Sequence, residues 1–484
     1  MAINLKFYGG VGEIGGNKIL LDTGKTRVFL DFGMSFKRSN MFFSEFLQPR
    51  KSNGVGDFIE MGLLPDIKGI YRRDYLEHTG IKPREKPFVN GVLITHAHAD
   101  HCAYVHHLRH DIPIYCSWET CAIMQAIEDT SQTGWTELIN LKKSFQIRKR
   151  KTKEGFTRVK GKEAKIPRKI FMRKTFEIKE IKAEAIPVNH SLPGACGFII
   201  NSQGKTIVYT GDLRFHGWGG NLTKKFVEKA EKENPDILIC EGTRIDETSI
   251  ESEELVKERS KKVIESTKQL VIVNFPVRDL DRMKTFYEIA KETDRKLVIS
   301  LKQAYLLELM KDSKYKYPTI NDKHIRIFIP KKGWGIWKDQ RFPEEIQLQD
   351  FDYWERSLLS HKHTVSWKEV SENQSEFILR NDIFELKELI DIKPKKGSSY
   401  IRSIVEPFDP EMEIEFERLK NWLKHFNLLP IHQIHCSGHA NQIDLKKIIE
   451  VIAPKKVIPI HTEKPEIFKE IVPKGTKLEI IKKA

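Results

Sequence analysis

A short histidine-rich motif constrains this chain of 484 residues more than any other feature: Thr95-His96-Ala97-His98-Ala99-Asp100-His101. It follows an apolar run at 92–94, which predicts a buried strand, and precedes residues 102–108, which predict a helix. Three imidazoles and a carboxylate held at such a turn are the donors that zinc and similar metals prefer. The motif therefore predicts a metal centre. Surface histidines beside an ordinary helix, the simpler alternative, would not need this order.

Three later predicted strands each end in a side chain that suits such a centre: His190, Asp212 and Glu241. An acid at a strand end often caps the following helix, so each one is weak support alone. Together they are typical of side chains that separate strands bring to one edge of a layered sheet, where active sites lie. Asp31 ends an earlier apolar strand, where its carboxylate either orients a metal ligand or forms a turn.

Two further histidines stand near the end of the sequence. His439 lies in Ser437-Gly438-His439-Ala440, before a predicted helix at 442–451, and His461 follows the next predicted strand. The backbone amides at the start of that helix suit an anion. The alternatives are a capping role for His439 and a surface turn for His461.

The opening of the chain contains the pattern GxGxxG, from Gly10 to Gly15. A dinucleotide site needs a helix after these glycines, because the helix N-terminus holds the pyrophosphate. A strand-like run, residues 18–21, follows instead. We therefore expect a tight loop that passes close to the metal site.

The distribution of charge along the chain indicates what kind of partner the protein binds. Lys and Arg number 82 against 67 Asp and Glu, a net charge of +15. Residues 142–174 hold fifteen Lys and Arg against two acids, or +13, so nearly the whole excess lies in one insertion. Such density favours contact with nucleic acid phosphates, and the strongest run is Arg148, Lys149, Arg150 and Lys151. A solvated loop that keeps the protein soluble is the alternative.

The length predicts more than one domain. From about 245 to 429, predicted strands alternate with helices, a pattern typical of a parallel α/β domain. Residues 35–90 predict an ordered insertion near the site, and neither that stretch nor 331–368 has an assigned role. The six cysteines form no CxxC pair and predict reduced thiols. We find neither a membrane-length apolar run nor a signal peptide, and expect a cytoplasmic protein with no membrane partner.

The motifs, in their order, resemble those of a known family. Asp31, residues 96–101, His190 and Asp212 look like the successive motifs of the metallo-β-lactamase fold. Glu241 and residues 437–440 and 459–463 resemble the additional motifs of the β-CASP subgroup, in particular those of ribonuclease J-like and cleavage-factor-like RNA nucleases. The resemblance spans essentially the whole chain.

This resemblance implies an α/β protein with a four-layer αββα metallo-β-lactamase fold and an inserted α/β β-CASP domain. The first part of the metallo-β-lactamase domain would be residues 1–243, including the basic insertion 142–174. The β-CASP domain would be 244–429, and residues 430–484 would complete the first domain.

The resemblance also implies two Zn²⁺ ions, with Mn²⁺ or Mg²⁺ as alternatives. By position, one ion would be held by His96, His98 and His190, and the other by Asp100, His101 and His461. Asp212 would bridge them, while Asp31 and Glu241 would orient the ligands. The catalytic residues would be Asp100, Asp212 and His439; phosphate or RNA would contact Ser437, Gly438 and His439, together with Arg148, Lys149, Arg150 and Lys151 of the insertion.

The implied function is hydrolysis of RNA phosphodiester bonds by a hydroxide that bridges the two metals, as a 5′-to-3′ exonuclease, an endonuclease or both, in RNA processing or decay. Single-stranded RNA is the expected partner, and the oligomeric state is left open, with a homodimer as one possibility. The alternatives are a DNA nuclease of the β-CASP repair branch, a non-catalytic RNA-binding subunit, and a small-molecule metallo-hydrolase. His461 disfavours the first because valine is common at this position in that branch, and the filled ligand positions disfavour the second.

Overall fold

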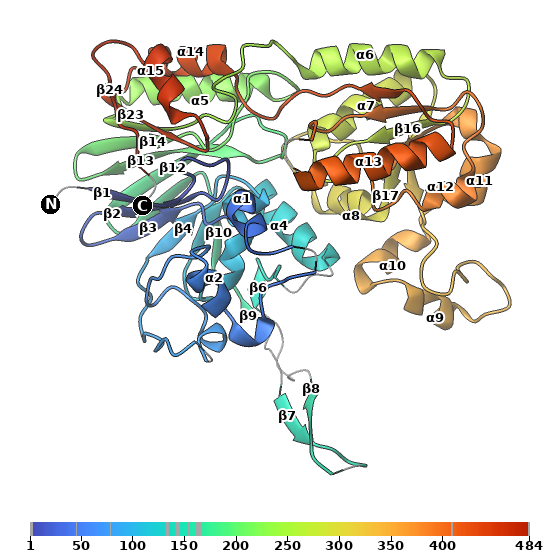
Figure 1. The fold of residues 1–484 in the computed structure, drawn as a ribbon, viewed down its shortest axis with the longest axis horizontal. Coiled ribbons are helices and arrows are strands. Elements are labelled where there is room, and N and C mark those ends of the chain that lie inside the picture. Colours follow the sequence, from blue (N-terminus) through green and yellow to red (C-terminus); the bar gives the residue numbers. More distant parts are fainter. Residues whose placement is uncertain are drawn as a thin grey trace.

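The computed structural model describes residues 3–44, 46–77, 79–131, 135–141, 146–152, 154–159, 166–407 and 410–482. Two sheets pack face to face in one half of the molecule (Figure 1). The strand order in the first is β1 (Asn4–Gly9), β2 (Lys18–Asp22), β3 (Arg27–Leu30), β4 (Gly91–Leu93), β5 (Ile114–Cys116) and β10 (Ile170–Met172). In the second it is β11 (Thr175–Ile178), β12 (Ile181–Pro187), β13 (Cys196–Ser202), β14 (Lys205–Tyr209), β15 (Ile237–Glu241), β23 (Lys456–Ile460) and β24 (Lys477–Leu478).

The alternation of side chains along β2 explains the layers. Ile19 and Leu21 join an apolar core that takes side chains from both sheets, whereas Leu20 points to the opposite face. That outer face is covered by α4 (Trp118–Thr130). The outer face of the second sheet packs against α5 (Gly220–Lys232), α14 (Gln442–Ile452) and α15 (Phe468–Ile471). The expected four-layer αββα fold is confirmed.

The third sheet forms the other half of the molecule. Its order is β19 (Thr364–Val365), β18 (Ile325–Phe328), β17 (Lys296–Ser300), β20 (Phe377–Arg380), β16 (Val271–Asn274), β21 (Ser399–Arg402) and β22 (Ile431–Gln433), and every pair is parallel. One face packs against α6 (Glu253–Ser266), α7 (Leu280–Glu292) and α8 (Leu301–Leu309). The other packs against α11 (Trp367–Glu372), α12 (Glu388–Ile392) and α13 (Pro410–His425). The predicted parallel α/β arrangement is confirmed.

The division into domains at 243/244 and 429/430 stays a proposal. After β15 the chain leaves the second sheet, and it returns there with β23. The short strand β22, just past the second proposed boundary, pairs with β21 of the third sheet.

The described residues between 35 and 90 form an ordered segment, as expected. They form α1 (Phe36–Asn40), α2 (Gly56–Glu60) and two short 3-10 helices, η1 (Lys51–Asn53) and η2 (Arg73–Tyr75). Their side chains Val55, Phe58 and Ile70 are buried against the first sheet. Residues 331–368 include α9 (Glu344–Gln347), 3-10 helix η4 (Leu348–Asp350) and α10 (Tyr353–Leu359).

The basic insertion contains an antiparallel hairpin of β7 (Gln146–Lys149) and β8 (Phe156–Val159), which projects from the body of the molecule (Figure 1). The short strands β6 (Asn140–Leu141) and β9 (Ile166–Pro167) pair at its base. Residues 142–145, 153 and 160–165 of the insertion lie outside the described residues, as does the side chain of Arg148. No helix in the described ranges has the length and apolarity needed to cross a membrane. All six cysteines are free and five of them are buried, as predicted.

Candidate metal centre

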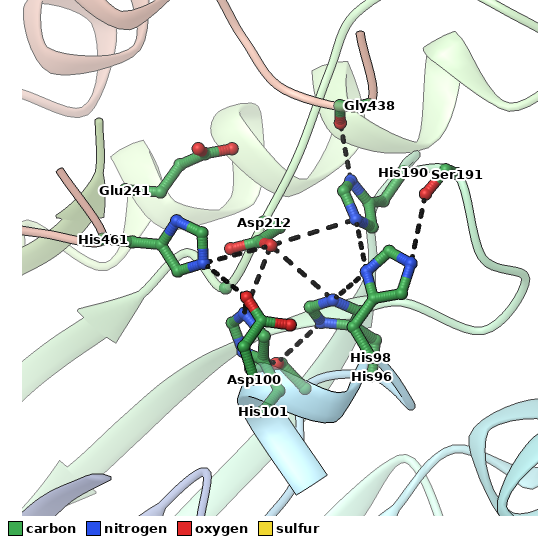
Figure 2. A network of polar contacts seen from close by, with 12 residues as sticks. His96, His98, Asp100, His101, His190, Ser191, Asp212, Glu241, Gly438 and His461 are labelled. Carbon is green, nitrogen blue, oxygen red and sulfur yellow. Dashed lines mark hydrogen bonds and ion pairs between the residues drawn. The ribbon is translucent and has the colours of Figure 1, made fainter. Parts of the chain in front are cut away.

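The ends of several strands bring the predicted ligands together on one edge of the two packed sheets (Figure 2). The 96–101 motif follows β4 and enters α3 (Ala99–Cys102), and the predicted helix beyond it is a short 3-10 helix, η3 (Ala103–His107). His190 follows β12, and Asp212 follows β14. His461 follows β23.

One group of donors consists of His96, His98, His190 and Asp212, and all of its ligand atoms lie within 4.8 Å of one another. Nδ1 of His98 is 2.9 Å from Nε2 of His96 and 3.1 Å from Nε2 of His190. Oδ2 of Asp212 lies 3.6 Å from Nε2 of His96 and 3.8 Å from Nε2 of His190. Nitrogens that face one another in this way suit a cation between them.

A second group consists of Asp100, His101, Asp212 and His461. Oδ2 of Asp212 is 3.2 Å from Nε2 of His101 and 3.7 Å from Nε2 of His461. Oδ2 of Asp100 lies 3.1 Å from Nε2 of His461. The same Asp212 oxygen thus belongs to both groups, which is the geometry of a bridging ligand.

An independent observation also indicates that these residues suit a metal ion. Nε2 of His101 and Oδ1 of Asp212 are buried without a hydrogen-bond partner, and such atoms are rare unless an ion or water completes them. Burial lowers the pKa of His96 and His190 well below the usual range, and neighbouring histidines lower it further. Neutral imidazoles are the form that binds metal. The histidines and carboxylates therefore form a candidate metal-binding site.

Asp31 fixes the orientation of His101. Nδ1–H of His101 donates to Oδ2 of Asp31 at 2.7 Å, which leaves Nε2 free to face Asp212. The Thr95 hydroxyl and the Tyr209 hydroxyl donate to the same oxygen at 2.9 Å and 2.5 Å. A carboxylate behind a histidine in this way sets its tautomer and raises its basicity.

Glu241 supports two other histidines. Nδ1–H of His439 donates to Oε2 of Glu241 at 2.9 Å. The Thr243 hydroxyl donates to the same oxygen at 2.9 Å and lies 2.8 Å from Nδ1 of His461. Glu241 thus links His439 and His461, as the predicted orienting role requires.

The turn of residues 437–440 packs directly on the site. Nδ1–H of His190 donates to the carbonyl of Gly438 at 2.5 Å, and the amide of His439 donates to the Ser437 hydroxyl at 3.2 Å. The expectation of free amides at the start of the following helix is wrong in part. The amide of Gln442 donates to the Glu247 carbonyl, and that of Asp444 to the Asn441 side chain, so both are already used.

The glycine-rich loop passes close to the site, as predicted, and the strand β2 follows it. A Cβ on Gly15 would lie 2.6 Å from Oδ2 of Asp100, and one on Gly33 would lie 1.7 Å from the Asp100 carbonyl. The loop also holds His461, whose amide donates to the Gly10 carbonyl at 2.7 Å. His461 has φ 53°, so its backbone is in the left-handed region that non-glycine residues rarely adopt, a conformation often found at functional sites.

A cleft of about 1050 Å³ opens at the metal centre. We call it the central cleft; its walls include His98, Ser191 and Gly438 on one side and residues from β16, β17, β20 and β21 of the third sheet on the other. The exposed residues Lys149, Arg150 and Lys151 lie on the projecting hairpin and do not line it.

The sequence did not point to several contributing residues. Thr95 and Thr243 each contact both a carboxylate and a histidine through the hydroxyl, and the Tyr209 hydroxyl donates to Asp31. Their only signal was position, because each lies within three residues of a predicted ligand or orienting acid. A buried ion network of Arg214, Glu253 and Arg282 beside the 437–440 turn had no sequence signal.

Two segments match known protein families. Residues 65–258 match the beta-lactamase superfamily domain, and residues 419–469 match the Zn-dependent metallo-hydrolase RNA specificity domain. The chain belongs to the metallo-β-lactamase superfamily. Within that superfamily it is a metal-dependent hydrolase of the β-CASP, ribonuclease J-like type, as the motifs predicted.

Relatives of this superfamily member extend over most of the chain. Ribonuclease J of Mycoplasma pneumoniae is 22% identical over 474 residues, which span 94% of this chain and 67% of that protein. Ribonuclease J of Pyrococcus abyssi is 22% identical, over 95% of this chain and 90% of that protein. A crystal structure of a protein of unknown function from Enterococcus faecalis superposes with a TM-score of 0.70 at 22% identity, and covers 99% of this chain and 98% of that one. This likeness shows the fold.

Proposed function

We propose that the protein is a zinc-dependent ribonuclease that hydrolyses phosphodiester bonds of single-stranded RNA, as a 5′-to-3′ exonuclease, an endonuclease or both. The observation that carries the proposal is the pair of donor groups that share Asp212 where the central cleft opens. The matched RNA specificity domain and the ribonuclease J relatives support RNA as the substrate.

In this proposal His96, His98 and His190 would hold one divalent cation, Asp100, His101 and His461 would hold the other, and Asp212 would be shared by the two groups. Such a pair of cations stabilises negative charge on a phosphate and makes water a stronger nucleophile. Asp31 holds Nε2 of His101 toward the site. Glu241 and Thr243 do the same for His461.

His439 lies beside the metal centre, against His190 and Glu241. Burial alone lowers its pKa, but the neighbouring carboxylates of Glu241 and Asp212 raise the pKa of His439 to about 9. The imidazole is anchored through Nδ1 to Glu241. It stabilises the charge that develops during phosphodiester cleavage or donates a proton to the leaving oxygen.

The central cleft holds the RNA strand. Aromatic rings of Trp354, Phe384 and Phe416 line it and offer stacking surfaces for bases. Seven Lys and Arg and seven Asp and Glu line it as well, so the cleft has no net charge. Among the described residues that line the cleft, Arg278, Lys302 and Lys387 are exposed and have no carboxylate within 4.0 Å, so they are the cations best placed to contact phosphates.

The test is cleavage of matched single-stranded RNA and DNA, each with a labelled 5′-monophosphate or 5′-hydroxyl end, by the metal-loaded protein. The control variant carries Asp100→Ala and His101→Ala. We expect products from RNA that the control does not form: mononucleotides from a 5′-exonuclease, internal fragments from an endonuclease. Equal cleavage of DNA would move the assignment to the repair branch. No cleavage of either polymer by protein with bound metal would refute the proposal.

A further inference from the structure

A second pocket lies beside the metal centre. Its volume is about 200 Å³, and we call it the lysine-aromatic pocket. One wall contains Asn189, His190 and Trp218 from the half with the packed sheets. The other contains Lys284 of α7 and residues 314–317, which precede β18 of the third sheet. Leu192 lines both this pocket and the central cleft.

The charge of this pocket is unbalanced, unlike that of the central cleft. Lys284, Lys314 and Lys316 line it, and the one carboxylate in its wall is that of Asp281. Oδ2 of Asp281 already accepts a hydrogen bond from Nη2 of Arg214 at 2.9 Å. Within the described part of the chain, none of the three ammonium groups lies within 4.0 Å of a carboxylate. The pocket therefore favours an anion.

Aromatic rings stand beside these cations. Nζ of Lys284 lies 4.4 Å from the centre of the Trp218 ring, and Nζ of Lys314 lies 5.1 Å from that of Tyr315. Trp218 is 46% exposed, and its Nε1–H donates to the Thr285 hydroxyl at 3.3 Å, which fixes the plane of the ring. An exposed indole held at one orientation offers a stacking surface for a flat ring.

We propose that the lysine-aromatic pocket binds a phosphorylated nucleotide, with its base on Trp218 or Tyr315 and its phosphate among Lys284, Lys314 and Lys316. The nucleotide is either free or the end of an RNA chain. A volume of about 200 Å³ is too small for a duplex. His190 belongs to both this pocket and the metal centre, but the lysines and aromatic rings that carry the proposal are not ligands of that centre, so the proposal stands whether or not the metal centre cleaves RNA.

The test is calorimetric titration of the metal-stripped whole chain with AMP, adenosine and a 5′-phosphorylated RNA hexamer. Without metal, binding is measured apart from cleavage. We expect AMP or the hexamer to bind at least tenfold more tightly than adenosine, because the lysines recognise phosphate. Tighter binding of AMP identifies a free nucleotide as the ligand, and tighter binding of the hexamer identifies the end of an RNA.

Matched lysine pairs separate the pocket from general surface charge. Lys284→Met with Lys314→Met should weaken AMP or hexamer binding at least tenfold. The control pair, Lys311→Met with Lys323→Met, removes the same charge from exposed positions that do not line the pocket and should change binding less than twofold.

Two further variants guard against a folding defect. Lys284→Arg keeps the charge and should retain binding, while Trp218→Leu should remove the change in tryptophan fluorescence that AMP or the hexamer causes. Equal weakening by both lysine pairs, equal binding of adenosine and AMP, or no binding at all would overturn the assignment.

Discussion

Asp31 is the residue on which the orientation of the second ligand group depends. It is fully buried and accepts hydrogen bonds from His101, Thr95 and Tyr209. Asp31→Asn keeps the size of the side chain but presents an amide where an acceptor is needed. We expect metal affinity to fall about 10- to 100-fold, the usual cost of losing such a support.

Metal content after dialysis against a competing chelator measures this loss. Asp22→Asn, the same change in the neighbouring strand β2, does not touch the histidines and should leave affinity unchanged. Equal metal binding by the wild type and Asp31→Asn would contradict the orienting role.

His107 makes stability depend on pH. It is buried among aromatic rings, and its Nδ1 has no hydrogen-bond partner. Burial, with Arg72 and Arg168 nearby, lowers the pKa of His107 to about 3. The unfolded chain takes up this proton near pH 6.5, whereas the folded protein does not until about pH 3. Between these values the free energy of unfolding falls as pH falls, by about 1.4 kcal/mol per pH unit for this one group.

We therefore expect His107→Phe to lose stability less steeply than the wild type between pH 6.5 and pH 4.5, measured by urea unfolding. His110→Phe removes an exposed histidine from the same segment and serves as the control. If the stability of His107→Phe fell with pH as steeply as that of the wild type, this histidine would not titrate in the way its burial implies.

Most residues of the candidate metal centre could be picked out from the sequence, because the 96–101 motif, His190, Asp212 and His461 each follow an apolar strand. His96, Asp212 and His461 needed only that pattern and their family motifs. Thr243 and Tyr209 were not predictable, because each hydroxyl becomes important only when the fold places it against a buried carboxylate, that of Glu241 for Thr243 and that of Asp31 for Tyr209. No local pattern encodes such a contact.

At the scale of elements, a buried ion network ties the two halves of the molecule together. The Glu253 carboxylate at the start of α6 accepts from Arg282 of α7 at 2.8 Å and from Arg214, which follows β14, at 3.3 Å. Nη2 of Arg282 also donates to the Cys436 carbonyl at 3.2 Å, and Nη1 of Arg214 to that of Ser437 at 3.4 Å. Both arginines thus hold the chain that leads to His439.

Breaking this network should be costly. Glu253→Gln leaves two buried guanidinium groups without their shared carboxylate, and we expect the free energy of unfolding to fall by about 3–5 kcal/mol. Glu254→Gln, the same change at the adjacent exposed position, should have almost no effect. Urea unfolding measures both variants, and an equal small change in both would show that the network adds nothing to stability.

The elements of the third sheet were predicted more reliably than the network between them. Strands such as β17 and helices such as α7 have strong apolar patterns, and the structure confirms them. The amides that start α14 were misjudged, since their partners at Glu247 and Asn441 come from tertiary contacts and a capping side chain. Periodicity does not report either of these contacts.

At the scale of the whole molecule, positive charge is concentrated on the projecting hairpin rather than in the central cleft. Lys149, Arg150 and Lys151 are exposed on it. If the hairpin contacts RNA phosphates, replacing these three residues with Gln should weaken binding and reduce the slope of log affinity against log salt by about 0.7 for each lost contact.

The matched control replaces three exposed lysines of α5 with Gln: Lys224, Lys225 and Lys232. RNA affinity measured from 50 to 300 mM salt distinguishes the two variants. An unchanged slope in the hairpin variant, or equal changes in both, would assign the insertion a role in solubility alone.

The proposed function requires two metal ions, held around Asp212, for the cleavage of RNA. The most direct measurement adds Zn²⁺ or Mn²⁺ in steps to metal-stripped protein and records the initial rate of cleavage of a 5′-labelled single-stranded RNA. We predict no cleavage without metal and a rate that rises to a plateau at two equivalents per chain. Asp212→Asn should abolish the rise, because its oxygen is common to both ligand groups. Cleavage by the stripped protein, or full activity in Asp212→Asn, would contradict the account.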